Sequence, residues 1–253
     1  MNFGPAVPDA AWLEPPDLYL ARGGDVEIDR PLFQGDVFAD IPILQLPTTP
    51  PGSLDGSIEL AYNPQLAMLV PHPCQCYNGD NVRPYLTVAP VSLVEDYTTF
   101  GEDRKGAKDK FALPDLLVPN PSSGTPEALS YVANLGRLTS VPKKYFKESK
   151  RISCLSHQGL GLLAKRLTMF QLRHEVELAN AMAYTMEEWH EAKLMQAWVR
   201  KHGKLKGFST FLRTPVNVPG VGDGLTAPYE VRAGAIDALL ELITGDPVLE
   251  PES

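Results

Sequence analysis

Residues 67–92 read AMLVPHPCQCYNGDNVRPYLTVAPVS, and this stretch decides the fold because it holds two strand signals and a turn signal between them. The apolar runs at 66–70 and 85–91 are short and end at turn residues, which is typical of buried strands. Asn-Gly is the strongest short signal for a β-hairpin, so we predict the turn at Asn78 and Gly79. The stretch therefore predicts a sheet built from sequential antiparallel strands.

Strand signals continue on both sides of this stretch. Upstream, the partly alternating segment FQGDVFADIPIL predicts a strand at 36–44. Downstream, KFALPDLLVP predicts a strand or edge segment at 110–119, and β-rich residues predict another near 130–139. Segments rich in Gly, Pro, Ser and charged residues predict the connecting loops, at 47–56, 100–110 and 120–127.

The hydrophobic period changes after residue 150, where three helices are predicted. In the first, apolar residues recur every three or four positions from Leu160 to Phe170, and Ser156 is the predicted N-cap. A capping box of Thr185 and Glu188 is expected to open the second, and Gly203 to close it. The third presents Ile236, Leu239, Leu240 and Ile243 on one face and ends before Gly245.

Strands followed by helices predict an α+β fold in which a small, partly closed barrel at about 31–150 precedes amphipathic helices. Proline is abundant, with 24 residues, and much of it lies near the termini. We therefore expect extended Pro-rich arms at both ends. The predicted organisation is an acidic arm at 1–30, a barrel with its closing helix at 31–180, and a helical extension with an acidic arm at 181–253.

The charge of the chain is unevenly distributed. The net charge is −8, with −8 on residues 1–60, +6 on residues 61–220 and −6 on residues 221–253. This balance argues against nucleic-acid binding by the whole surface, but the basic middle can bind an anion locally or bind the acidic ends. No apolar run approaches the roughly 18 residues of a membrane helix. With no secretory signal and an odd number of cysteines, the expected compartment is cytoplasmic.

His72, Cys74 and Cys76 form a His-x-Cys-x-Cys pattern that allows three interpretations. In an extended strand the three side chains share one face, and together with Cys154 and His157 they could supply tetrahedral ligands for zinc. Alternatively, His72 and Cys74 form a nucleophilic pair. In the third interpretation the thiols are small buried apolar groups and His72 is hydrogen-bonded in a loop.

A second candidate region combines basic and aromatic residues. VRKHGKLKGFSTFLR at 199–213 suits a nucleic-acid strand through phosphate contacts and base stacking, or is simply a solvated helix end. Two Trp residues on the preceding helix suit either the core or a partner-binding face. The candidate binding residues are Trp189, Trp198, Lys204, Lys206, Phe208 and Arg213.

Several segments together resemble the PemK/MazF-like family. These are GDVFADIPI (35–43), AMLVP (67–71) and LTVAPVS (86–92), then ANLGRLTSVPKKYF (133–146) and RISCLSHQGLGLLAKRL (151–167). The resemblance implies an SH3-like barrel, usually dimeric, that is found in metal-independent endoribonucleases of toxin–antitoxin pairs.

The chain departs from the pattern of that family where the chemistry would lie. The family's early Arg-Pro step has no counterpart at 45–66, which contains no Arg or Lys. The sole Arg-Pro is Arg83–Pro84, and Ser92 matches the assisting hydroxyl, so the resemblance implies Arg83 and Ser92 as catalytic residues only if activity is retained. In an alternative register, 85–91 is the family's second strand.

The leading expectation is a non-catalytic interaction or assembly module on a PemK/MazF-like barrel, such as a phage-type connector. A metal-independent endoribonuclease is the first alternative, and a zinc- or thiol-dependent protein that uses His72, Cys74 and Cys76 is the second. We expect a protein partner or self-association, with RNA as a further possibility. No cofactor and no membrane association are expected, and the location is cytoplasmic, or in the virion for a phage component.

Overall fold

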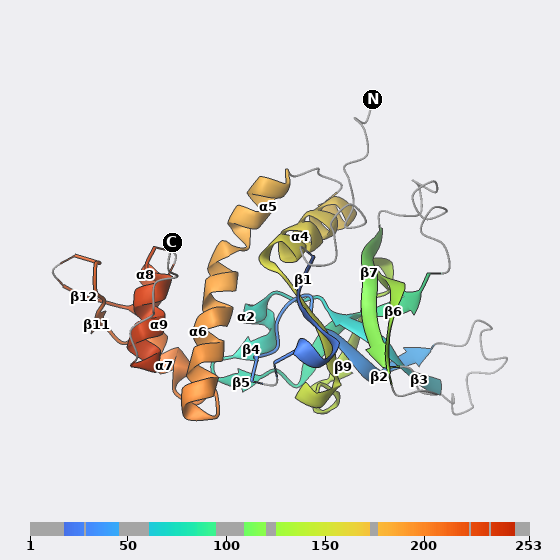
Figure 1. Cartoon of the computed structure of the whole chain (residues 1–253), viewed down its shortest axis with the longest axis horizontal. Coiled ribbons are helices and arrows are strands. Elements are labelled where there is room, and N and C mark those ends of the chain that lie inside the picture. The colour runs from blue at the N-terminus through green and yellow to red at the C-terminus, as the bar shows by residue number, and fades with distance from the viewer. Residues whose placement is uncertain are drawn as a thin grey trace, which may run out of the picture.

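The computed structural model of the chain describes residues 18–27, 29–45, 61–94, 109–119, 125–172, 177–222, 224–232 and 234–245. A nearly closed antiparallel barrel is followed by helices that cover one side of it (Figure 1). The α+β prediction is therefore confirmed. Residues 1–17 of the predicted N-terminal arm and the last residues of the C-terminal arm, 246–253, lie outside the described residues.

Eight strands form the barrel sheet in the order β1-β10-β2-β3-β6-β8-β7, with β9 also paired to β6. All of these pairings are antiparallel. The strands are β1 (Tyr19–Arg22), β2 (Val37–Gln45), β3 (Ala61–Leu69), β6 (Tyr85–Leu93), β7 (Lys110–Pro119), β8 (Pro126–Asn134), β9 (Thr139–Pro142) and β10 (Arg151–Leu155).

Side chains of β1, and not a backbone ladder, bridge the two edges of the sheet. The hydroxyl of Tyr19 donates to the carbonyl of Pro114 at 2.9 Å, and Arg22 donates to the carbonyl of Asp115 at 2.7 Å. The register of β7 shifts at this point, between Leu113 and Leu116. A bulge leaves backbone groups unpaired, so the two carbonyls are available to the side chains of β1. Residues 19–22, predicted as part of an arm, thus belong to the barrel.

Most predicted strands are found close to their predicted bounds, with two local differences. The strand expected near 130–139 is two strands, because a short 3₁₀ turn at Leu135–Arg137 separates β8 from β9 and the side chain of Asn134 accepts from the N–H of Gly136. The hairpin turn is also displaced by one residue, since Asn78 pairs with Asn81. The two central residues are therefore Gly79, with φ of +61°, and Asp80.

Six α-helices are described beyond residue 156: α4 (His157–Leu172), α5 (Leu178–Tyr184), α6 (Met186–His202), α7 (Phe208–Arg213), α8 (Pro228–Val231) and α9 (Ile236–Thr244). The predicted caps at Ser156, Gly203 and Gly245 are confirmed: Ser156 accepts from the N–H of Gly159, and both glycines are left-handed. The predicted capping box is wrong. The hydroxyl of Thr185 donates back to the carbonyl of Met182, because α5 precedes it directly.

The central strands are buried on both faces. Along β3, Met68 belongs to one apolar cluster with α4, whereas Ala67 and Leu69 belong to a second cluster that contains residues of α6, α7 and α9. Successive side chains of a strand point to opposite faces, so the barrel interior and the helical layer share the same strands. This explains why the run at 66–70 is continuously apolar.

A buried ionic cluster joins the start of β2 to the closing strand β10. The carboxylate of Asp36 is fully buried, with Arg30 Nε at 3.6 Å and Arg151 Nε at 3.3 Å. It also accepts from the N–H of Phe33 at 3.0 Å. A buried charge is tolerated only when it is paired, so both guanidinium groups depend on the carboxylate of Asp36.

A second polar contact attaches the helical layer to the barrel. Asp80, in the hairpin formed by β4 (Tyr77–Asn78) and β5 (Asn81–Val82), accepts from the N–H of Gly207 at 2.7 Å and of Ser209 at 2.8 Å. A carboxylate at the start of a helix satisfies backbone donors that have no partner within the helix. Asp80 therefore caps α7 from a distant part of the chain.

We expect Asp36→Asn to lower the free energy of unfolding by about 3–5 kcal/mol, because two buried guanidinium groups lose their counter-charge. The measurement is urea unfolding followed by circular dichroism. Asp40→Asn is the control: the carboxylate of Asp40 is 68% exposed beside Lys150, so its loss should cost less than about 0.5 kcal/mol. Equal effects of the two substitutions would contradict a special role for Asp36.

We expect Asp80→Ala to lower the free energy of unfolding by roughly 1–2 kcal/mol near neutral pH. Burial raises the pKa of Asp80, but hydrogen bonds from Ser209 and Gly207 outweigh burial, so its pKa lies below the ordinary value of 3.8 for an aspartate side chain. The contribution of Asp80 is therefore present above that value and is lost as the pH falls through the lower folded-state pKa.

Urea unfolding of wild type and Asp80→Ala across the acidic range measures this dependence. The difference between them should shrink at the lowest pH at which both stay folded. Asp25→Ala removes an exposed carboxylate and is the control. A wild-type advantage that stays constant with pH would contradict the assignment.

Candidate functional site

The segment that carries His72, Cys74 and Cys76 is a short helix, α2 (Pro73–Cys76), and not an extended strand. Pro73 occupies the first helical position, where its fixed φ suits a helix start. His72 is the N-cap, and its Nδ1 accepts from the N–H of Cys74 at 3.2 Å. The expected common face is therefore wrong: Cys74 is exposed and Cys76 is buried.

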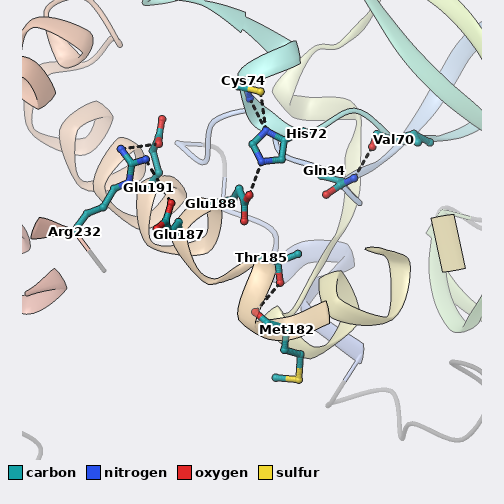
Figure 2. A network of polar contacts seen from close by, with 10 residues as sticks. All are labelled: Gln34, Val70, His72, Cys74, Met182, Thr185, Glu187, Glu188, Glu191 and Arg232. Atoms are coloured by element: carbon teal, nitrogen blue, oxygen red, sulfur yellow. Dashed lines mark hydrogen bonds and ion pairs between the residues drawn. The ribbon is translucent and has the colours of Figure 1, made fainter. Parts of the chain in front are cut away.

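His72 connects Cys74 to a carboxylate on a distant helix (Figure 2). Its Nδ1 lies 2.9 Å from Cys74 Sγ, and its Nε2 lies 2.6 Å from Glu188 Oε1 on α6. The backbone N–H of Cys74 is always a donor, so Nδ1 must be the acceptor and the ring proton lies on Nε2, facing the carboxylate. Thiol, imidazole and carboxylate thus form one continuous chain of contacts.

Glu188 is the acid of the first turn of α6 that faces the barrel. Its neighbours Glu187 and Glu191 face Arg232 instead, at 4.0 and 3.3 Å. Figure 2 shows the two sets of contacts on different sides of the helix. The sequence predicted Glu188 only as a capping residue. Its contact with His72 spans 116 positions, and no local pattern signals it.

The other cysteine and histidine candidates lie in separate environments. Burial, and then the charge of Asp36, raises the pKa of Cys76 to about 12. The same two causes raise the pKa of Cys154. His157 Nε2 donates to the carbonyl of Met182 at 3.0 Å. Within the described residues, no group of three or more His, Cys, Asp or Glu side chains is arranged to hold a metal ion.

Arg83 and Ser92, the residues implied by the family resemblance, lie at opposite ends of β6. Arg83 precedes the strand, and its Nε donates to the carbonyl of Tyr77 at 3.2 Å. Ser92 is opposite Val132 near the other end. From Tyr85 to Ser92 an extended strand spans roughly 23 Å at about 3.3 Å per residue. The fold does not bring the two side chains to one phosphate.

One end of the barrel gathers exposed basic residues, the exposed Tyr85 and the partly buried Tyr145, a set that sequence reasoning did not combine. The N–H of Lys143 donates to the carbonyl of Pro84 at 2.9 Å, and Tyr85 is opposite Pro142, so residues 83–85 lie beside 142–144. We call this the barrel-end surface: Arg83, Tyr85, Lys143, Lys144, Tyr145 and Lys147. Tyr85 is 64% exposed, and Lys144 Nζ lies 5.0 Å from the ring centroid of Tyr145.

The residues proposed from the 199–213 pattern are divided between packing and surface. Trp198 packs edge-on against Phe208, which is buried, at a centroid distance of 5.9 Å. Trp189 packs against Phe33 and stacks on His157. Both Trp side chains are only partly exposed, whereas Lys204, Lys206 and Arg213 are exposed. Both indole rings therefore serve packing, Trp198 within the helical layer and Trp189 between that layer and the barrel.

Comparison with known proteins adds no family assignment. No protein-family model matches the chain, and no curated protein matches it. The barrel is compatible with the resemblance drawn from the sequence, but no family follows from it. In the part of the chain that the structure describes, no helix is long and apolar enough to cross a membrane.

We expect only Cys74 to react with iodoacetamide in the folded protein, because the other two thiols are buried and stay protonated at neutral pH. Mass spectrometry of the intact protein and its peptides measures the number and position of labels. Cys74→Ser should take no label until urea unfolds it. Labelling of Cys76 or Cys154 before unfolding would contradict the described burial.

Proposed function

We propose that the protein is an interaction module whose barrel-end surface binds single-stranded nucleic acid without cleaving it. The observation that supports this proposal is that the exposed ring of Tyr85 and four exposed cations, Arg83, Lys143, Lys144 and Lys147, lie in two segments that the β6–β9 pairing brings together. Cations that follow a phosphate backbone and an aromatic ring on which a base stacks are the two components of such sites.

Charge limits this binding to one part of the molecule. The net charge of −8 repels a polyanion from most of the surface, so attraction depends on a local excess of cations. Among the described acids, Glu148 next to Lys147 is exposed, and Asp40 is paired with Lys150 at 3.4 Å. The ammonium group of Lys144 lies over the ring of Tyr145, so this cation and this aromatic ring are next to each other on the barrel-end surface.

The distance along β6 argues for binding without strand scission. Cleavage at a 2′-hydroxyl needs both charge stabilisation at the phosphate and proton transfer. Arg83 can supply the charge, but Ser92 lies too far along the strand to act on the same phosphate. The two residues that the endoribonuclease alternative requires, Arg83 and Ser92, therefore do not form one site.

Fewer observations support the assembly role expected from the sequence than support nucleic-acid binding. Its aromatic anchors were Trp189 and Trp198, and both rings pack within the fold. The ends of the acidic arms that supported it, residues 1–17 and 246–253, lie outside the described residues. Assembly with a protein partner stays a prediction.

Fluorescence anisotropy of a short labelled single-stranded RNA, measured over a series of salt concentrations, tests the proposal. We expect Lys143→Ala with Lys144→Ala to weaken binding and to reduce the salt slope by about 0.7 for each lost phosphate contact. Tyr85→Ala should weaken binding by roughly 1–3 kcal/mol through lost stacking. The labelled RNA should remain intact on a gel.

The control removes two charges from the helical layer, with Lys204→Ala and Lys206→Ala. Equal loss of affinity in both double variants would indicate attraction by overall charge and would overturn the proposed site. Poly-glutamate is a second control, since it is a polyanion without bases. If it binds as tightly as RNA, and if Tyr85→Ala does not weaken RNA binding, the proposed site is overturned. RNA fragments that wild type produces and Arg83→Ala does not would replace binding with cleavage.

A further inference from the structure

The contacts of Cys74, His72 and Glu188 are not needed for nucleic-acid binding at the barrel end. An N-cap requires only His72 Nδ1, which accepts from the N–H of Cys74. It requires neither the thiol at 2.9 Å nor the carboxylate that α6 brings to within 2.6 Å of the other ring nitrogen. A nucleophile, a base and a group that orients the base are therefore present at one place.

We propose that Cys74 is a catalytic nucleophile that accepts an acyl group from a thioester substrate. The thiol is exposed, so a substrate can reach it. This inference goes beyond the proposed nucleic-acid binding and does not depend on it.

His72 is the general base, and the protein holds its ring in the required form. Nδ1 is unprotonated and faces Sγ, since the N–H of Cys74 also donates to it. Glu188 acts through His72 and is a positioning residue: it accepts the Nε2 proton and stabilises the imidazolium that forms when the thiol loses its proton. Arg232 is engaged by Glu187 and Glu191, so its charge does not compete for Glu188.

The backbone around Cys74 selects the class of substrate. Pro73 has no N–H, the N–H of Cys74 donates to His72 Nδ1, and the N–H of Gln75 donates to the carbonyl of His72 at 2.8 Å. None of these groups is free to stabilise an oxyanion, and one such donor is worth about 10²–10³ in rate. An amide with a poor leaving group is therefore disfavoured. A thioester, which releases a stable thiolate, needs less of this help.

The transfer can be written with every atom accounted for. His72 Nδ1 takes the proton from Cys74 Sγ, and the sulfur attacks the carbonyl carbon of the thioester. A new carbon–sulfur bond forms, and the bond to the leaving sulfur breaks. The leaving thiolate then takes the proton from the imidazolium and departs as a thiol. The acyl group remains on Cys74 as a new thioester, and no oxidant or reductant is needed.

Acetylation by phenyl thioacetate, followed by mass spectrometry of the intact protein and its peptides, tests the proposal. We expect Cys74 to be acetylated about 10²-fold faster than N-acetylcysteine at the same pH and concentration. Cys74→Ser should remain unmodified. Cys154→Ala, which removes a buried thiol, should react like wild type and is the control.

Two further variants separate catalysis from structure. His72→Asn keeps a side-chain acceptor for the N–H of Cys74, and thus the helix cap, but removes the base. Its rate should fall to that of N-acetylcysteine. Glu188→Gln keeps an acceptor and removes the charge, so it should lower the maximal rate of acetylation several-fold and leave the half-saturating thioester concentration unchanged.

Iodoacetamide labelling of Cys76 and Cys154 reports whether each variant is folded, because both thiols are buried. If a folded wild type reacts no faster than N-acetylcysteine, Cys74 is only an exposed thiol and the proposal is overturned. The proposal is also overturned if folded His72→Asn is acetylated as fast as wild type. If His72→Asn does not fold, an unchanged acetylation rate in Glu188→Gln overturns it instead. RNA binding measured on the same samples shows separately whether the barrel-end proposal holds.

Discussion

The buried carboxylate of Asp36 is the interaction on which the rest of the structure depends. It faces two guanidinium groups, and each of these also lies over an aromatic ring: Arg30 over Phe33 at 5.4 Å and Arg151 over Phe38 at 5.4 Å. The backbone carbonyl of Asp36 accepts from the N–H of Leu69. One residue thus joins strands β2, β3 and β10. Because two cations share one anion in the interior, removing Asp36 leaves both guanidinium groups without a counter-charge.

Both proposed sites arise from the connection between β3 and β6, which this framework anchors. Residues 71–84 leave the barrel, form α2 and the β4–β5 hairpin, and return as Arg83 at the barrel end. The helical layer holds the same connection through Asp80 and Glu188. Functional side chains on a loop positioned by a rigid scaffold are a common arrangement. Here the connection presents the imidazole of His72 to α6 and a cation beside the lysines of residues 143–147.

Local patterns predicted most of the framework, since their causes lie within a few residues. Short apolar runs bounded by turn residues marked β3 and β6, partial alternation marked β2, and Ser156, Gly203 and Gly245 capped helices as expected. The failures have equally local causes. Alternation suggested that Cys74 and Cys76 share a face, but a histidine cap followed by proline begins a helix. Thr185 could not open a capping box because α5 leads directly into α6.

The α+β class, the order of strands before helices, and the thiol beside an imidazole follow from neighbouring residues and can be read from the chain alone. The role of the imidazole depends on contacts between distant segments. Glu188 reaches His72 across 116 positions, and Lys143 comes beside residues 83–85 through the pairing of β6 with β9. Such contacts depend on how whole strands and helices pack, and packing between distant segments leaves no periodic signal in the chain.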